Sequence, residues 1–363
     1  MDIEAPTLIL HKERVLRNIE RMVTKANKSR VRLRPHFKTH QSAQIGAWFK
    51  DYVKAITVSS VEMAIYFANH GWNDITIAFP VNLREISKIN ELAKKITLHL
   101  LVESKESILF LKNNLKAPVN IWIKIDVGSH RTGIRWNNFS QILELVQEVK
   151  GIEILSFKGI LTHAGHSYLG KSKEEIRSIY LDSVSKMKDV QTKLKQNGFL
   201  DVEISVGDTP TCSIVEDLST VDEIRPGNFV FYDVMQLRLG SCSEKDIALA
   251  IACPVVAKHK DRFEIVIYGG AIHLSKDFIV LEDGTKIFGY VSLLEKNGWS
   301  PSVKNTYVSS LSQEHGIIKT HENFFEKVKI GDILVILPIH SCLPPNLLKK
   351  YLTFDNKTLN SMN

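Results

Sequence analysis

The sequence lacks long apolar runs, paired cysteines and low-complexity stretches. Its longest apolar run, Ile247 to Ala257, is too short to span a bilayer, and the acidic start at Asp2 and Glu4 is unlike the basic start of a signal peptide. The four cysteines show no CxxC pair and no disulfide-framework spacing; they are Cys212, Cys242, Cys253 and Cys342. We therefore expect a cytoplasmic protein that works in a reducing compartment and does not enter a membrane.

The charge pattern shows no stripe of basic residues. The formal net charge is +7 and the pI is near 9.0, but the lysines are scattered over helix-like segments. This distribution is typical of a solvated surface, so we expect no nucleic-acid partner. With 363 residues, the chain exceeds the length that one hydrophobic core usually supports, which favours a large domain with a smaller one attached.

Short β-branched runs alternate with segments of helical period from residue 31 onward, the pattern of repeated βα units. Eight strands are predicted, at residues 31–34, 54–59, 74–79, 97–102, 119–126, 154–162, 202–206 and 221–225. Helices are predicted between them, at residues 43–49, 61–69, 83–94, 105–114, 139–150 and 173–197. Gly198 would cap the last of these helices. Eight such units predict an α/β fold, a (β/α)8 TIM-type barrel over residues 11–233. The alternative is an open doubly wound sheet, but no GxGxxG motif follows the first strand to support it.

Alternating, strand-like stretches dominate from about Val234. They are found at residues 248–259, 264–268, 278–281, 306–310 and 333–337. This pattern predicts a separate all-β domain over residues 234–363. The early apolar run at residues 7–10 precedes the barrel and is expected to pair with these strands, so residues 1–10 are assigned to the same domain.

Unusual polar residues cluster directly after the predicted barrel strands, where TIM-type barrels place their active sites. These segments are RPHFKTH (34–40), DVGSHR (126–131), THAGHSY (162–168), GDTPT (207–211) and RPGN (225–228). Residues 207–211, followed by a helix-like segment at 213–218, would offer free backbone N–H groups and hydroxyls to a phosphate. A close backbone approach at Gly227 would add to this phosphate site.

In these motifs, together with EIRPGNFVFYD and PIHSC, the sequence resembles the D-serine dehydratase and D-threonine aldolase group of alanine-racemase-like pyridoxal-phosphate enzymes, fold type III. The resemblance extends from about Ala5 to Tyr351. It implies that Lys38 binds pyridoxal 5'-phosphate covalently and that Arg225 approaches the pyridine nitrogen, keeping it unprotonated. The other cofactor contacts that it implies are His163 against the ring, Arg131 near the phenolic oxygen, Tyr168, and a phosphate cup of Gly207, Thr209, Gly227 and Asn228.

His340 and Cys342 form a second candidate site. Two residues apart in a strand-like segment, they are expected to point to the same side, and imidazole with thiolate suits Zn²⁺. On spacing alone a buried cysteine is more often a small hydrophobic residue. The family resemblance implies a metal here, Zn²⁺ or alternatively Mn²⁺ or another divalent ion, with His-x-Cys in dehydratase-like members and His-x-Asp in aldolase-like ones.

Two positions depart from the family pattern. Pro344-Pro345 replaces a spacer that usually contains Thr or Ala, and Gln41 follows the lysine motif where a basic residue is common. The first departure puts the pocket for the substrate carboxylate in doubt, not the metal. The remaining histidines, including His36, are assigned no role.

The resemblance implies an enzyme that eliminates the β-hydroxyl of D-serine, or of a similar D-amino acid, to give a keto acid and ammonia. Retro-aldol cleavage to glycine and an aldehyde, as in D-threonine aldolase, is the alternative within enzymes. A non-catalytic pyridoxal-phosphate carrier is the alternative outside them, although carriers of this fold lack the β-domain. The relatives of this fold also suggest a homodimer.

Overall fold

The computed structural model describes residues 2–362, so the terminal residues of the predicted β-domain, Met1 and Asn363, lie outside the described residues. The chain divides into two compact units. The first contains the N-terminal segment up to Glu20, residues 39–48, and the chain from Asn228 onward. The second contains residues 21–38 and 49–227. The chain therefore passes from one unit to the other directly after Lys38 and directly after Gly227.

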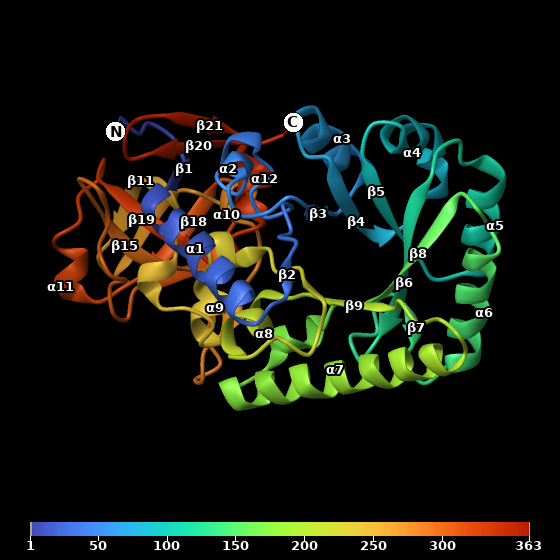
Figure 1. The fold of residues 1–363 in the computed structure, drawn as a ribbon. Coiled ribbons are helices and arrows are strands. Elements are labelled where there is room, and N and C mark those ends of the chain that lie inside the picture. The colour runs from blue at the N-terminus through green and yellow to red at the C-terminus, as the bar shows by residue number, and fades with distance from the viewer. Residues whose placement is uncertain (1, 363) are drawn as a thin grey trace. The chain divides into compact units, whose positions relative to one another are not determined.

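The second unit is a TIM-type barrel of parallel strands (Figure 1). Its strands follow the order β2-β10-β9-β8-β6-β5-β4-β3, and β7 pairs with β6 beside this path. Their bounds are β2 Arg32–Leu33, β3 Ile56–Val58, β4 Asp74–Pro80, β5 Thr97–Val102, β6 Val119–Asp126, β7 Ile134–Arg135, β8 Leu155–Leu161, β9 Glu203–Val206 and β10 Glu223–Ile224. A parallel bridge between His36 and Thr57 joins the two ends of this order. All eight predicted strands are present, and the predicted fold class is confirmed.

The interior of the barrel is unusually polar. On β6, alternate residues face opposite sides of the sheet. Ile121, Ile123 and Ile125 are fully buried on one side, while Asn120 and Trp122 hydrogen-bond to His99 of β5 on the other. The interior side of the barrel thus holds polar groups such as Asn120 and His99 beside a small buried apolar cluster of Leu101, Trp122 and Leu161.

The helices around the barrel lie close to their predicted positions, except for η2, which is not predicted, and α8. They are α3 Val61–Asn69, η1 Leu83–Glu85, α4 Ile86–Ala93, α5 Lys105–Asn114, α6 Phe139–Lys150, η2 Gly165–Leu169, α7 Lys173–Gln196 and α8 Thr209–Ile214. Serine side chains cap α3, α5 and α7 by accepting a backbone N–H in the first turn. Gly198 follows α7 with a φ of +88°, as expected of a C-terminal glycine.

The helix predicted at residues 213–218 is wrong in its position. α8 begins earlier, at Thr209, because Asp208 caps it and Pro210 stands in its first turn; it gives way to extended backbone at Val215. The long helix α1 (Lys12–Lys28) is absent from the prediction, as are the short helices of the first unit from Asn228 onward. The buried apolar residues of α1 have helical spacing but lie in a strongly charged segment; they are Val15, Ile19, Met22, Val23 and Ala26.

The first unit is built on a sheet with the order β12-β18-β17-β15-β19-β11-β1-β20-β21, antiparallel except for the parallel pair β1 and β20. Its strands are β1 Thr7–Leu10, β11 Leu249–His259, β12 Glu264–Tyr268, β15 Gly289–Glu295, β16 Gly298–Trp299, β17 Tyr307–Leu311, β18 His315–Lys319, β19 Ile333–Pro338, β20 Lys350–Thr353 and β21 Thr358–Asn360, with the separate pair β13 Ile279–Val280 and β14 Lys286–Ile287. As predicted, the early run β1 joins this sheet, where it lies between β11 and β20. The all-β part of the predicted fold class is therefore confirmed.

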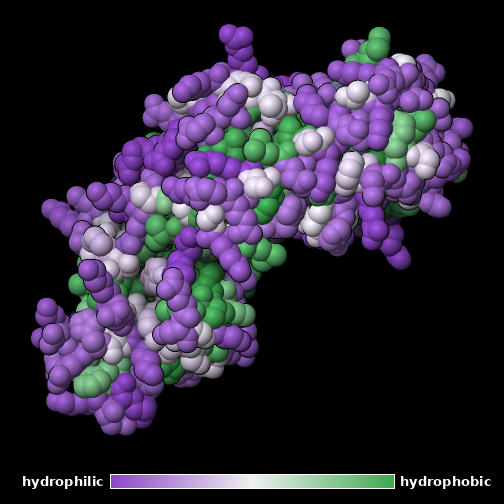
Figure 2. Space-filling model, turned by 90° about the horizontal axis from the view of Figure 1, so that it is seen from below, coloured by the Kyte–Doolittle hydropathy of each residue, from purple (hydrophilic) through white to green (hydrophobic). Residues whose placement is uncertain are grey.

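Short helices complete the first unit: α2 Ala43–Ala47, η3 Asn228–Val230, α9 Val234–Arg238, η4 Glu244–Asp246, α10 Ala271–Leu274, α11 Glu322–Phe325 and α12 Leu343–Leu348. No helix within residues 2–362 combines the length and apolarity that crossing a membrane requires. The face shown in Figure 2 is mainly hydrophilic, with apolar residues in scattered patches.

Candidate active site

Lys38 lies at the end of a firmly anchored segment that follows β2. Phe37 is fully buried, and its ring packs against Phe49, Phe67 and Trp72. The backbone N–H of Phe37 donates to the Thr57 carbonyl at 2.8 Å. These contacts fix the backbone next to Lys38, so the position of its amine depends mainly on the side chain itself.

Two neutral histidines accompany Lys38. Burial lowers the pKa of both His36 and His163 well below the usual range, and the charges of Lys38, Arg131 and Arg225 lower it further. The Nδ1 of His163 is hydrogen-bonded to the Gly207 carbonyl. A carbonyl only accepts, so Nδ1 carries the proton and Nε2 does not. An uncharged imidazole of fixed tautomer can pack against an aromatic cofactor.

Arg131 is exposed in a loop that Asp126 organises. The Asp126 carboxylate accepts three hydrogen bonds of 3.0 Å, from the backbone N–H groups of Gly128 and His130 and from Nδ1 of His130. Gly128 has a φ of +138° in this loop, a conformation that favours glycine. The loop places Arg131 where its charge affects His36 and His163.

Arg225 follows β10 and is 4% exposed. Its Nε donates to Ser205 Oγ at 2.7 Å, and its Nη2 donates to the carbonyls of Thr162 and Ser205. These bonds hold the guanidinium in one orientation inside the barrel.

Two side-chain atoms of the predicted phosphate cup, Thr209 Oγ1 and Asn228 Oδ1, lack a hydrogen-bond partner among the described residues, and only the first can donate. Thr209 is buried at the start of α8, and within the described part of the chain its hydroxyl makes no hydrogen bond. A buried hydroxyl is normally paired, so this hydroxyl fits a phosphate oxygen. The next backbone groups of α8 do not add free donors, because Pro210 has no N–H and the N–H of Thr211 donates to Asp208. Gly207 lies so close to Arg225 that a Cβ would come within 2.9 Å of its Cβ and carbonyl oxygen. Gly227 ends the barrel unit, and Tyr168 lies in η2.

The second candidate site lies in the loop after β19, in the first unit. Cys342 is 9% exposed and precedes α12. Its sulfur is 3.3 Å from Thr39 Oγ1 and 3.8 Å from Asn228 Nδ2. Nδ1 of His340 is 3.3 Å from Asp233 Oδ2. This is an ion-pair contact rather than a well-formed hydrogen bond, and with Nδ1 turned toward the carboxylate, the Nε2 atom is left for a ligand.

This arrangement fits a metal that has two protein ligands. Within residues 2–362, no group of three or more His, Cys, Asp or Glu side chains is placed to bind one ion. An ion held by His340 and Cys342 would keep open positions, as catalytic metal sites do. The side chains of the two residues interact with each other, so the donor set is compact enough for one ion.

Two residues near Lys38, His36 and Lys124, have no role in the sequence-based prediction. His36 has no role in it, yet its Nδ1 is 3.4 Å from the backbone nitrogen of Lys38. Lys124 is 5% exposed, and burial, together with the charges of Arg225 and Arg131, lowers its pKa to about 7. A lysine in the middle of the apolar run WIKID is the available signal for Lys124.

Comparison with known proteins identifies both parts of the chain. Residues 10–234 match the family described as alanine racemase, N-terminal domain, and residues 248–354 match the putative serine dehydratase domain. The chain is 27% identical to the D-serine dehydratase of Dictyostelium discoideum over 385 residues, which cover 99% of this chain and 96% of the relative. It is 21% identical to the D-threonine aldolase of an Arthrobacter species, over 93% of this chain and 86% of that enzyme.

The D-threo-3-hydroxyaspartate dehydratase of Delftia sp. HT23 is similar in sequence and in structure. The two chains are 27% identical over 94% of this chain and 92% of the relative. The solved structure of that enzyme superposes with a TM-score of 0.90, at 25% identity, over 99% of this chain and 98% of the other. Its solved forms include a cysteine-to-alanine mutant in the metal-free form. The chain therefore belongs to the alanine racemase N-terminal domain family, in the group of pyridoxal-phosphate lyases that includes D-serine dehydratase and D-threonine aldolase.

Proposed function

We propose that the chain catalyses β-elimination of D-serine, or of a similar D-β-hydroxy amino acid, to a keto acid and ammonia. The observation that carries this proposal is the His340–Cys342 pair, a histidine that Asp233 orients and a buried cysteine. The resemblance associates His-x-Cys with dehydratases and His-x-Asp with aldolases. The 27% identity to two dehydratases supports the same reaction.

When bound, pyridoxal phosphate would supply an electron sink for charge that develops at Cα. Lys38 would hold it covalently, and the lysine amine, once the substrate has replaced it, would remove the Cα proton. His163 would pack against the ring as a neutral imidazole, and Arg131 would lie near the phenolic oxygen. Arg225 would face the pyridine nitrogen and keep it unprotonated, because a guanidinium only donates.

The phosphate would bind at the Thr209 hydroxyl, a buried donor that lacks a partner among the described residues. Thr209 would donate its hydroxyl, and Gly207, Gly227 and Asn228 would complete the cup. Tyr168 would make a further polar contact to the cofactor or the substrate.

His340 and Cys342 would hold Zn²⁺, or alternatively Mn²⁺ or another divalent ion, which would act as a Lewis acid at the β-hydroxyl. The chain itself connects this pair to the cofactor residues. Thr39, which contacts Cys342, directly follows Lys38, and Asn228, which also contacts it, directly follows Gly227.

D-Threonine aldolase activity is the second candidate, supported by aldolases among the relatives. It would use the same residues, with the substrate hydroxyl deprotonated rather than expelled. A non-catalytic pyridoxal-phosphate carrier is disfavoured because such a carrier has no use for the His340–Cys342 pair. We further propose that the protein is a cytoplasmic homodimer, which light scattering of the purified protein would test.

The products of purified enzyme with D-serine, D-threonine and D-threo-3-hydroxyaspartate distinguish these functions. We expect keto acid and ammonia, loss of this activity on chelation, and restoration by Zn²⁺. Cys342→Ala should behave like the chelated enzyme while it retains the cofactor, since the cofactor residues do not include Cys342. Glycine and an aldehyde as the main products would assign the chain to the aldolases, and no product from any D-β-hydroxy amino acid would favour a carrier.

A further inference from the structure

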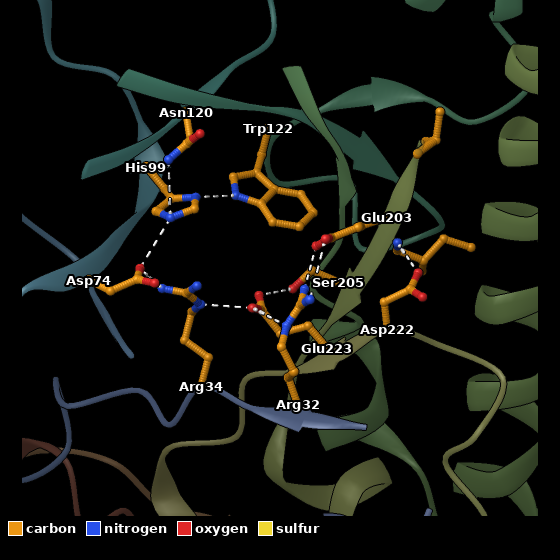
Figure 3. A network of polar contacts seen from close by, with 12 residues as sticks. Arg32, Arg34, Asp74, His99, Asn120, Trp122, Glu203, Ser205, Asp222 and Glu223 are labelled. Carbon is orange, nitrogen blue, oxygen red and sulfur yellow. Dashed lines mark hydrogen bonds and ion pairs between the residues drawn. The ribbon is translucent and has the colours of Figure 1, made fainter. Parts of the chain in front are cut away.

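A network of polar side chains lies in the barrel interior. Arg225 is bonded to it through Ser205, and Figure 3 shows its continuation from Ser205 through Glu223 and Arg34 to Asp74. Ser205 of β9 and Glu223 of β10 come first, and Arg34, directly after β2, comes next. Asp74 of β4 follows. All of these side chains except Asp74 are buried. A buried polar network destabilises a fold unless every member is paired, so a network of this length indicates a functional role.

Arg225 is the charged member of this network that has no direct counter-ion. Its guanidinium is buried, and its hydrogen bonds go to neutral oxygens, those of Ser205 and Thr162. Among the described residues, no carboxylate bonds to it directly. A buried charge without a counter-ion is strongly unfavourable, so the nearest carboxylate affects both the charge and the orientation of this arginine.

Glu223 provides that carboxylate through one bridging hydroxyl. Arginine only donates, so Ser205 Oγ accepts from Arg225 Nε at 2.7 Å. The hydroxyl proton of Ser205 is then free to donate to Glu223 Oε1, also at 2.7 Å. The direction of both hydrogen bonds is therefore fixed: Arg225 donates to Ser205, and Ser205 donates to Glu223.

The second carboxylate oxygen of Glu223, Oε2, is also hydrogen-bonded. Arg34 donates from Nε to Glu223 Oε2 at 2.8 Å and from Nη1 to Asp74 Oδ1 at 2.6 Å. Nε2 of His99 lies 3.1 Å from the same Asp74 oxygen. Nε of Arg32 also lies 3.7 Å from Glu223 Oε2, and Arg32 pairs with Glu203 in addition. Glu223 therefore cannot turn away from Ser205 without losing Arg34.

The electrostatics agree with this geometry. Burial raises the pKa of Glu223, but Arg34, Ser205 and Arg225 outweigh burial and hold it below the usual range, so the carboxylate stays charged. Burial lowers the pKa of Arg225 to about 10, and Glu223 is the strongest influence that raises it.

We propose that Glu223 is a positioning residue for Arg225, acting through the Ser205 hydroxyl, and that Arg34 and Asp74 fix Glu223 in turn. This inference rests on the proposed function, in which Arg225 faces the pyridine nitrogen of the cofactor. Glu223 touches neither cofactor nor substrate in this assignment. It keeps the guanidinium charged and aimed, and so controls whether the pyridine nitrogen takes up a proton.

The test is ¹⁵N NMR of holoenzyme loaded with cofactor labelled at the pyridine nitrogen. Wild type should give the shift of an unprotonated nitrogen at neutral pH. Glu223→Gln and Ser205→Ala should move it toward the protonated value. In both variants kcat for D-serine should fall by about tenfold with KM within twofold, because misplacing a catalytic group affects the reaction more than ground-state binding. The double variant should match Glu223→Gln alone, since Glu223 acts through Ser205.

Glu62→Gln is the control with the same kind of substitution. Glu62 of α3 pairs with Lys88 on the exposed surface of the barrel and takes no part in the network of Arg225 and Glu223, so the nitrogen shift and kcat should stay at wild-type values. If Glu223→Gln does not fold, Ser205→Ala still tests the proposal, because it keeps both charges. A wild-type nitrogen shift in folded Ser205→Ala would overturn it.

Failure of the proposed function would look different. If Arg225→Ala leaves the nitrogen shift unchanged, Arg225 does not face the cofactor and the assignment of the site is wrong. If Arg225→Ala moves the shift but Ser205→Ala and Glu223→Gln do not, only the positioning role is wrong.

Discussion

Replacing Asp208 by asparagine should remove a pH dependence of stability that the structure assigns to this carboxyl group. Asp208 is 4% exposed and caps α8. It accepts hydrogen bonds from the Thr211 backbone N–H and hydroxyl, both at 2.8 Å, and from Ser167 Oγ at 2.9 Å. Burial raises the pKa of Asp208 to about 6, and these hydrogen bonds lower it only in part.

The direction of this pH dependence follows from which state, folded or unfolded, binds the Asp208 proton more tightly. An unfolded Asp has a pKa of about 3.9, so between about pH 4 and 6 the folded protein holds a proton on Asp208 that the unfolded chain has lost. Stability therefore falls as pH rises through this window. At 1.36 kcal/mol per pKa unit, the difference between the folded and unfolded pKa of Asp208 contributes about 3 kcal/mol to the free energy of unfolding at low pH. About 2 kcal/mol of this contribution is lost between pH 4.5 and 7.5.

The Asp208→Asn variant would keep the cap without titrating, since asparagine and aspartate are equally good N-caps. We expect this variant to gain about 2 kcal/mol relative to wild type between pH 4.5 and 7.5. Urea unfolding of the two apoproteins, compared at each pH, measures this difference while the other titrating groups cancel. Apoprotein is used because Thr209, the next residue, is a proposed phosphate contact.

Two results would refute this reasoning. A constant difference between the two proteins would mean that Asp208 has the same pKa in both states. If wild type instead gains stability relative to Asp208→Asn as pH rises, the three hydrogen bonds outweigh burial, and the carboxylate is ionised in the folded protein.

Further predictions concern the cofactor, the metal and the barrel. Lys38→Ala should abolish the visible absorption of the lysine-bound cofactor; borohydride labelling of another lysine would show that the assignment is wrong. Gly227→Val should weaken cofactor binding at least about tenfold, or 1.4 kcal/mol, by blocking the backbone approach, measured by cofactor titration of the folded variant. Cys342→Asp should shift the preference from Zn²⁺ toward harder ions such as Mn²⁺, measured as activity after chelation and metal addition. Gly159→Ala should destabilise the protein by at least about 2 kcal/mol, because φ is +156° and a Cβ would lie 2.1 Å from the Glu203 carbonyl oxygen; unchanged urea unfolding would contradict this.

Local sequence pattern was enough to predict the fold class and many of the elements. The strands at residues 97–102 and 119–126 and the helices at 61–69 and 105–114 have the predicted bounds. Their alternating or helical spacing of apolar residues is a local property that burial reinforces. The motif RPHFKTH singles out Lys38 because a lysine at a barrel strand end is informative when other such ends also carry polar residues.

The pairing of the polar groups, in contrast, is set by tertiary packing. The contact of Cys342 with Thr39 joins residues 303 positions apart, and that of Arg34 with Glu223 joins residues 189 positions apart. The unpaired hydroxyl of Thr209 and the burial of Lys124 likewise depend on packing from distant strands. The periodicity of apolar residues predicts which side of a helix or strand is buried. The partner of a buried charge, in contrast, comes from a distant strand that packs against it. The spacing of residues along the chain does not predict which strand that is.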